Sequence, residues 1–553
     1  MPVALSYPGV YVQEIPSGVH TITGVATSIT AFVGRAARGP VDTPVTINNY
    51  GDFERIFGGL WASSRLGFAV RDFFANGGGQ AIIVRLYNND TANNAKPAQA
   101  KIKVGALSFA AAAKGAWGSA LRATVDTDVS ASVAAAYGLE TADLFNLTVR
   151  EVDARGETLK RERHLNLTVK DSPRRLDKVL AAQSQLLVWD GAWPAAPPAV
   201  AAKDDDITTA TAALAAAQAA NPQVPATITA AQKALNDAQT AAAGNDGLAL
   251  SQTNFTPNGG QAAKTGLYAL EKADSFNLLC IPPYTASDDV DVSLISAAAS
   301  YCEARRAFLL IDAPTGWIDK ATAKTGFAAS PDQVGARSAN AAIFFPRLRQ
   351  ANPLRDNQLE AFAACGAVAG VIARTDGDRG VWKAPAGLQA TLNGVPDLTV
   401  SLTDAENGEL NQLGVNCLRA FPAAGKVVWG ARTLRGADQL ADENKYIPVR
   451  RTTLYLEESL VRGLQWVVFE PNDEPLWAQI RLNVGAFMQG LFRKGAFQGA
   501  SPREAYFVKC DSETTTQADI NLGVVNVLVG FAPLKPAEFV VIGIQQMAGQ
   551  IAV

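Results

Sequence analysis

A short apolar run near the end of the 553-residue chain constrains its fold most, the stretch Glu538–Ile544 (EFVVIGI). Both alternating faces of this run are apolar and it carries one charge, so it predicts a β-strand that cannot be left in water. Pro533 and Pro536 separate it from the strand-like runs Ala505–Cys510 and Val524–Val529. A flat apolar strand at a terminus either folds back or pairs with the sheet edge of another chain. We therefore predict an inter-subunit strand, with these residues as candidates for burial: Phe539, Val540, Val541, Ile542 and Ile544.

A second strand-like run lies near the other end, from Gly9 to Ile15 (GVYVQEI), bracketed by Pro8 and Pro16. Proline at both ends favours an edge or added strand over a central one. The segment that follows, Ser17–Thr27, has glycines and small hydroxyl residues but no periodic apolar face, which predicts an extended, unpacked linker. An ordinary first strand of the first domain is the alternative. If the strand is donated, the residues that a partner would cover are Val10, Tyr11, Val12 and Ile15.

Alternating strand and helix patterns predict an α/β core. Two buried-strand runs, Ile29–Gly34 and Ala81–Leu86, enclose helical patterns over 50–57 and 64–76, and the alternation resumes near Phe276. The residues between differ in character: strand patterns up to Thr168 are followed by two Ala-rich helical patterns over 206–219 and 226–242. The predicted fold is thus α/β (mixed α+β) and multidomain, with a β-rich insertion that ends in a helical hairpin.

Composition limits the possible partners. About 150 residues per domain gives a prior of three or four domains, and the charged fraction of 18% lies below the usual ~25%, which favours assembly. Formal net charge is −3 and no basic run stands out, so nucleic acid and anionic membrane are poor partners. No apolar stretch approaches the ~18 residues of a membrane span, and no secretory signal is visible, so we expect a cytosolic protein without direct membrane insertion.

The residues that usually carry catalysis are sparse. The chain has two histidines, His20 and His164, no G-x-S-x-G, H-E-x-x-H or Walker A motif, and five well-separated cysteines that read as buried thiols. We expect no catalytic residue, cofactor or metal. Asp312, Asp376 and Asp378 could form a carboxylate site, but loop aspartates more simply cap turns. An α/β enzyme with an inserted lid domain therefore stays the main alternative, and a surface adhesin, which lacks an export signal here, is a third.

Several blocks resemble contractile tail sheath proteins of phages and contractile injection systems. Besides the C-terminal stretch 504–550 they include SYPGVYVQEIPSG (6–18), TSITAFVGRAARGP (27–40), DRGVWKAPAG (378–387), LNQLGVNCLRAFPAAGKVVWGARTL (410–434), YIPVRRTTLYLEESLVRGLQWVVFEPNDEPLWAQIR (446–481) and GAFQGASPREAYFVKCD (495–511). Residues 93–261 carry no such resemblance.

The resemblance implies a structural subunit, not an enzyme, that stacks helically around an inner tube and contracts to drive the tube through a target envelope. It also implies assembly in the bacterial cytoplasm into a phage tail or tail-like particle, with further copies, the inner tube protein, baseplate and terminator or cap proteins as partners. The predicted division is an arm and linker (1–27), a middle α/β domain (28–92 and 262–390), an inserted outer domain (93–261), an inner tube-facing domain (391–529) and a C-terminal arm (530–553). Tube-contact candidates are Glu457, Glu458, Arg481, Arg493 and Lys494.

Overall fold

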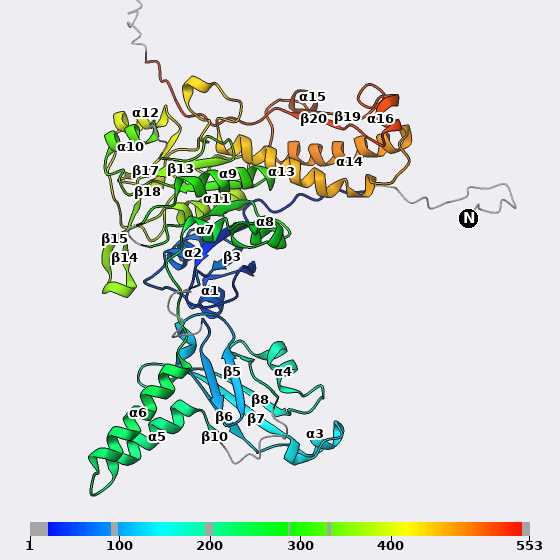
Figure 1. Cartoon of the computed structure of the whole chain (residues 1–553). Helices are drawn as coiled ribbons and strands as arrows, with labels where there is room; N and C mark the ends of the chain where they lie inside the picture. Colours follow the sequence, from blue (N-terminus) through cyan, green and yellow to red (C-terminus); the bar gives the residue numbers. More distant parts are fainter. Residues whose placement is uncertain (1–19, 90–97, 194–202, 286–287, 329–332, 545–553) are drawn as a thin grey trace, which may run out of the picture.

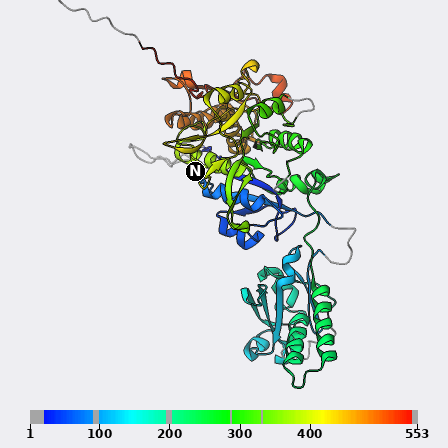
Figure 2. The same ribbon diagram turned by 90° about the vertical axis from the view of Figure 1, so that its left-hand side faces the viewer.

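The computed structural model describes residues 20–89, 98–193, 203–285, 288–328 and 333–544. An α/β body carries a pair of long helices at one end, and a separate lobe lies below it (Figure 1). Seen from the side, the lobe is joined to the body by a narrow neck (Figure 2). The predicted α/β, multidomain fold with a β-rich and helical insertion is confirmed.

An eight-stranded sheet forms the centre of the body, in the order β18-β17-β13-β12-β11-β1-β3-β2. Neighbours from β17 to β3 run parallel, while β2 and β18 pair antiparallel at the two edges. Strands of a parallel sheet are covered on both faces, which is why most residues of these strands are apolar. The strands are β1 (Thr30–Arg35), β2 (Val45–Ile47), β3 (Ala81–Leu86), β11 (Leu278–Cys280), β12 (Phe308–Asp312), β13 (Ala341–Phe345), β17 (Val415–Phe421) and β18 (Gly425–Val428).

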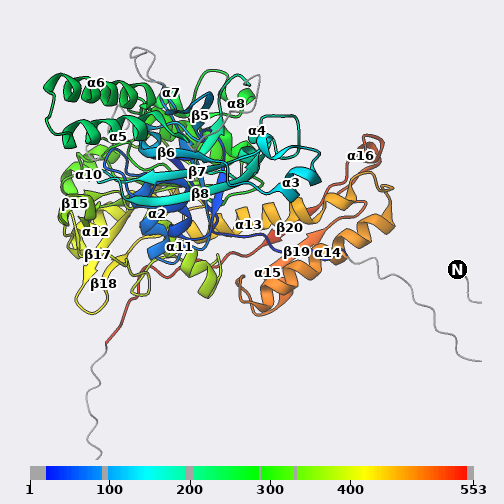
Figure 3. The same ribbon diagram turned by 90° about the horizontal axis from the view of Figure 1, so that it is seen from below.

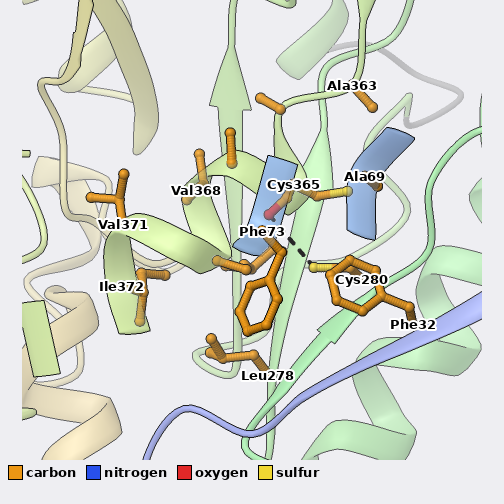
Figure 4. Close-up of a cluster of buried hydrophobic side chains, with 14 of the residues drawn as sticks. Phe32, Ala69, Phe73, Leu278, Cys280, Ala363, Cys365, Val368, Val371 and Ile372 are labelled. Atoms are coloured by element: carbon orange, nitrogen blue, oxygen red, sulfur yellow. Dashed lines mark hydrogen bonds between the residues drawn. The ribbon is translucent and has the colours of Figure 1, made fainter. Parts of the chain in front are cut away.

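Helices cover both faces of this sheet and create two cores. One core lies under α1 (Tyr50–Phe57), α2 (Leu66–Ala75) and α11 (Cys365–Arg379). Figure 4 shows its centre, where the Cys280 thiol donates a hydrogen bond to the Cys365 carbonyl at 3.6 Å. The other core lies under α9 (Val292–Ala304) and α10 (Lys320–Phe327). All five cysteines are free and buried, so they act as small apolar residues.

The inserted lobe has a hydrophobic core of its own. Its sheets contain β4 (Lys101–Val104), β5 (Leu107–Ala111) and β9 (Leu187–Trp189), and β10 (Lys203–Asp204), β6 (Leu121–Asp126), β7 (Phe145–Val152) and β8 (Thr158–Leu167). Its helices are α3 (Ala131–Ala136), α4 (Leu176–Gln183) and the predicted Ala-rich pair α5 (Asp206–Ala219) and α6 (Pro225–Ala242). Asp205 caps α5 by accepting a hydrogen bond from the Thr208 amide at 2.9 Å.

The insertion ends earlier in the chain than residue 261. Asn88 and Leu248 form an antiparallel bridge where the chain leaves and re-enters the body. Leu250 and Phe255 then pack in the core beneath α9, and Phe255 belongs to α7 (Gln252–Phe255), which α8 (Gly260–Ala263) follows. The edge at 261 is therefore corrected to about 248, because these apolar side chains serve the central sheet.

The domain boundary at residue 390 is also corrected. The sheet continues past residue 390, because β17 pairs with β13, so the α/β domain takes in part of the segment assigned to the inner domain. A small separate sheet contains β15 (Gln358–Phe362), which ends before α11 begins, with β14 (Leu348–Asn352) and β16 (Asp397–Leu398). The break between β15 and α11 occurs where the Asp312 carboxylate accepts hydrogen bonds from the Ala364 and Cys365 amides.

The C-terminal part is built on two long helices, α13 (Ile447–Gly463) and α14 (Glu474–Arg493). They lie side by side beyond the edge of the α/β body (Figure 3). Smaller elements rest on them: α15 (Pro502–Ala505), β19 (Tyr506–Lys509), α16 (Gln517–Asn521) and β20 (Leu528–Phe531). The remaining helix, α12 (Asp404–Asn411), precedes β17.

Candidate assembly interface

The sheet formed by β19 and β20 has only two strands, paired antiparallel from Tyr506↔Phe531 to Lys509↔Leu528. Side chains from both strands pack on the apolar cluster that α14 contributes. Phe507 and Leu528 nevertheless remain 49% and 53% exposed. Each strand also has one edge without a neighbouring strand among the described residues. Two strands alone are marginally stable, and unpaired edges accept added strands, so this sheet is a candidate strand acceptor.

The predicted C-terminal strand is fully accessible in the isolated chain. Phe539, Val540, Val541, Ile542 and Ile544 are 76%, 80%, 95%, 77% and 89% exposed and have no regular secondary structure. The chain runs away from β20 before it reaches them (Figure 1). These residues therefore form an apolar segment that lacks a partner within the described part of its own chain, as a donated strand requires. The N-terminal strand candidates, Val10, Tyr11, Val12 and Ile15, lie outside the described residues.

A buried ion pair holds the chain just before this exposed segment. Arg432 is fully buried, and its Nε and Nη2 donate to the two carboxylate oxygens of Glu538 at 2.8 and 2.6 Å. Tyr446 also donates to Glu538, at 3.2 Å. Burial alone would lower the pKa of Arg432, but the hydrogen bonds and charge of Glu538 raise it above its ordinary value. The Gln498 amide also donates to the Ala532 carbonyl, so the first residues of the C-terminal arm are attached at two points, Ala532 and Glu538.

The N-terminal linker is packed, contrary to prediction. Residues 20–27 are extended as expected, but they lie along α13 (Figure 1). His20 stacks on Trp466 with ring centroids 4.2 Å apart, and Ile22 is 6% exposed within the α13–α14 cluster. A Cβ at Gly463 would lie 2.6 Å from Ile22 Cγ2, so glycine makes room for this side chain. The sequence signal for this packing was a single apolar residue, Ile22, in a polar segment, which an analysis of periodicity does not detect.

A second buried arginine fixes the end of this linker. Arg451 on α13 donates to Asp376 on α11 at 2.9 and 2.6 Å and to the Thr27 carbonyl at 2.8 Å. The Arg451 and Asp376 side chains are 3% and 2% exposed. Each terminal segment is thus held beside the body by a buried arginine.

The five tube-contact candidates are brought together on α13 and α14 but are not equally available. Glu458 already binds Arg306 and Arg462, at 2.7 Å each, and although burial alone would raise the pKa of Glu458, these hydrogen bonds lower it. Glu457 lies 3.5 Å from Arg450, and Arg481 pairs with Glu474 at 2.5 Å. Arg493 and Lys494 are exposed and form no ion pair within the described ranges. They are the stronger candidates of the set.

Two of the three carboxylates considered for an enzyme site, Asp312 and Asp376, have structural partners, whereas Asp378 is exposed. Asp312 accepts the two amides at the start of α11, burial raises its pKa, and Asp376 binds Arg451. No cluster of three or more potential metal-binding side chains occurs in the described part of the chain. Among the helices described, none is both long and apolar enough to cross a bilayer.

Sequence reasoning missed Arg432 and Ile22; it predicted β19 and placed β20 about two to four residues early, but it did not assign their sheet as a strand acceptor. A lone acidic residue at the start of an apolar run, Glu538, was the signal that a buried basic partner exists. Nothing local identified that partner, which lies 106 residues earlier in the chain.

Comparison with known families agrees with this arrangement. Residues 256–434 match the phage tail sheath protein central domain and residues 442–546 match the phage tail sheath C-terminal domain, together just over half of the chain. The tail sheath protein of Vibrio phage KVP40 is 31% identical over 127 residues, which are 23% of this chain but only 18% of that protein.

Solved structures extend the similarity of fold to nearly the whole chain. The sheath of the extracellular contractile injection system PVC, in its contracted state, is 20% identical, with 99% of each chain covered and a TM-score of 0.55. The anti-feeding prophage helical sheath in its contracted state is 22% identical, with 98% and 100% coverage and a TM-score of 0.54. A sheath tail protein from Desulfitobacterium hafniense is 13% identical, with 91% and 93% coverage and a TM-score of 0.51. The chain belongs to the contractile tail sheath family.

Proposed function

We propose that the chain is the structural subunit of a contractile sheath, which polymerises helically around an inner tube and contracts to drive that tube through a target envelope. Subunits are joined by donated strands: the segment Phe539–Ile544 of one copy adds to the β19–β20 sheet of another. A contact between two different surfaces repeats without closing, and so produces a helical filament.

One observation carries this proposal: the described part of the chain presents both an exposed apolar segment, which has no partner there, and a two-stranded sheet with open edges. About five backbone hydrogen bonds at roughly 1 kcal/mol each would give ~5 kcal/mol per donated strand before side-chain burial. The structures of contracted sheaths that share this fold support the choice of assembly.

The test is the double substitution Val540→Asp and Ile542→Asp. Both residues are highly exposed in the single chain, so the free energy of unfolding should change by less than about 0.5 kcal/mol. Two buried charges would oppose strand addition, so negative-stain microscopy should show particles without tubes. The matched control is Leu159→Asp, a 67% exposed apolar residue on β8 of the inserted lobe, which should leave tubes intact. Normal tubes from the double variant would refute strand donation by this segment.

The same proposal assigns the remaining partners. Arg493 and Lys494 would contact an acidic surface of the inner tube protein, and baseplate and terminator or cap proteins would cover the first and last rings of subunits. Assembly would take place in the bacterial cytoplasm, within a phage tail or tail-like particle. We assign no catalytic role, cofactor or metal to the chain, because Asp312 and Asp376, two of the three carboxylates that an enzyme would use, are bound within the fold.

A further inference from the structure

The C-terminal segment crosses open space before it leaves the body. Residues 534–540 form one wall of a groove of about 930 Å³, and the opposite wall includes Trp382, Trp429 and Lys494. The segment is therefore not laid down on a close-packed apolar surface along its length. Pro533 forms a bridge with Phe497, and Phe539 is exposed. Between these two residues, every side-chain hydrogen bond that joins the segment to the described part of the body is made by Glu538.

The site that receives Glu538 is also held by contacts that do not involve the arm. The Arg432 guanidinium also donates to the Asn411 and Gly436 carbonyls at 2.8 and 3.1 Å and to Asp438 at 2.9 Å. Its backbone amide donates to Asn416 at 2.7 Å, and Asn416 lies on β17 of the central sheet. The guanidinium is thus fixed in position and presents Nε and Nη2 side by side, the fork that binds a carboxylate with two hydrogen bonds.

We propose that Arg432 is a carboxylate receptor that anchors the root of the C-terminal arm, so that the donated strand pivots after Glu538 and transfers its load to the eight-stranded sheet. Arg432 and Glu538 are then positioning residues for strand donation: they set where the strand leaves the subunit and how far it reaches. The role in assembly rests on the proposed function, whereas the anchoring itself is a property of the single chain and can be tested without tubes.

The first experiment measures arm mobility in the unassembled subunit. The native cysteines are buried, so a nitroxide spin label can be directed to one introduced cysteine, either Ala537→Cys beside the anchor or Val541→Cys beyond it. We expect the label at 537 to be immobile and the label at 541 to be mobile. Glu538→Gln should make the label at 537 as mobile as that at 541, because hydrogen bonds to a charged partner are worth about tenfold to a hundredfold in an equilibrium.

Two further variants make the result specific. Glu513→Gln removes the same charge from an 80% exposed side chain and should leave the label at 537 immobile. Tyr446→Phe removes one hydrogen bond to Glu538 and should give an intermediate mobility, which keeps the test informative if Glu538→Gln folds poorly. A label at 537 that is mobile in the parent, or that ignores both Glu538→Gln and Tyr446→Phe, would overturn the anchor.

The second experiment measures assembly. Glu538→Gln should raise the subunit concentration needed for tube formation about tenfold or more, since a loose root lowers the local concentration of the strand at its acceptor. If the root loosens while tubes form at the parent concentration, the assembly role of the anchor is wrong. The two proposals can also fail separately. If the double variant Val540→Asp, Ile542→Asp still forms normal tubes, while Glu538→Gln still makes the label at 537 mobile, strand donation is wrong and the anchor is supported.

Discussion

Buried charges at a few positions tie distant parts of the chain together. Arg451 bonds to Asp376 on another helix and to Thr27 at the end of the linker, and Arg432 bonds to Glu538. A buried ion pair contributes little compared with an apolar pair of the same size, but removing one partner leaves an uncompensated charge. These pairs therefore specify which segments meet, and they are sensitive to single substitutions.

The pair Arg451–Asp376 predicts a large loss of stability on neutralisation. Asp376→Asn keeps the shape of the side chain but leaves the Arg451 charge buried without its counterion, so urea unfolding should show a loss of about 3–5 kcal/mol. The nearby Asp378 is exposed, and Asp378→Asn should change stability by less than about 0.5 kcal/mol. Equal effects from the two substitutions would contradict a role for the buried pair.

Asp72 on α2 predicts a pH dependence. Burial raises its pKa to about 6 despite two hydrogen bonds from Arg71 at 3.2 and 3.1 Å, whereas an unfolded aspartate titrates near 3.9. Between about pH 4 and 6 the folded chain thus holds a proton that the unfolded chain has released. The stability that Asp72 contributes through this proton is complete below pH ~4 and is lost as the pH rises through ~6.

Asp72→Asn should remove that loss, because the amide oxygen can still accept both hydrogen bonds from Arg71. We expect the variant to be more stable than the parent by about 2–3 kcal/mol at pH 7.5 and nearly equal to it at pH 4, as measured by urea unfolding at both pH values. The same difference at both pH values would show that Asp72 does not titrate in this window.

At the level of elements, periodic patterns were sufficient for helices and buried strands but not for single-residue contacts. α1, α5 and α6 were predicted within a residue or two, because each repeats its apolar or alanine positions along the helix. The small sheet β14–β15 was missed, since its residues are largely polar: β14 alternates in burial, but two of its three buried residues, Gln350 and Asn352, are polar. Ile22 is the one buried residue of the described linker, 20–27, and one buried side chain produces no period.

Ile22 predicts how firmly the linker is held. Ile22→Ala should free residues 20–27 from α13, because the lost side chain is the one that fills the space over Gly463. Hydrogen exchange should report this at the Val25 amide, which donates to Ser459 Oγ at 3.2 Å, with exchange at least tenfold faster than in the parent. Thr23→Ala, at an exposed position in the same segment, is the control and should exchange like the parent. Unchanged protection in Ile22→Ala would show that other contacts hold the linker.

At the level of the whole molecule, the inserted lobe is a module with its own core. It is attached to the body through two neighbouring chain segments, which are bridged at Asn88 and Leu248. Some contacts cross the neck, including Arg38–Glu151 at 2.8 Å and the Arg35 guanidinium donating to the Asp246 and Gly247 carbonyls at 2.9 Å each. No buried apolar cluster is shared between lobe and body in the described ranges. We therefore expect that the lobe can be deleted if the deletion leaves the bridged segments at Asn88 and Leu248 in place.

We predict that replacing residues 90–243 with a short Gly-Ser turn gives a folded subunit that still forms tubes. The longer deletion of residues 93–261 should instead destabilise the body by several kcal/mol, because it removes Leu250 and Phe255 from the core. Circular dichroism with urea unfolding measures the stability of both variants, and negative-stain microscopy shows whether the short-deletion variant forms tubes. A folded short-deletion variant without tubes would place the lobe in the lattice contacts.

The position of β1 has a mechanical consequence. The linker enters β1 directly, and β1 lies between β3 and β11, with pairs from Thr30↔Ala81 to Arg35↔Leu86 on one side and from Thr30↔Leu278 to Phe32↔Cys280 on the other. A pull on the linker along the strand axis would load these hydrogen bonds in shear, so that they resist together, whereas a sideways pull would open them one after another. Because β3 precedes the insertion and β11 follows it, the force would spread through the sheet without passing through the lower lobe. The lobe could then differ in size or shape while the line of tension through a row of subunits stays the same.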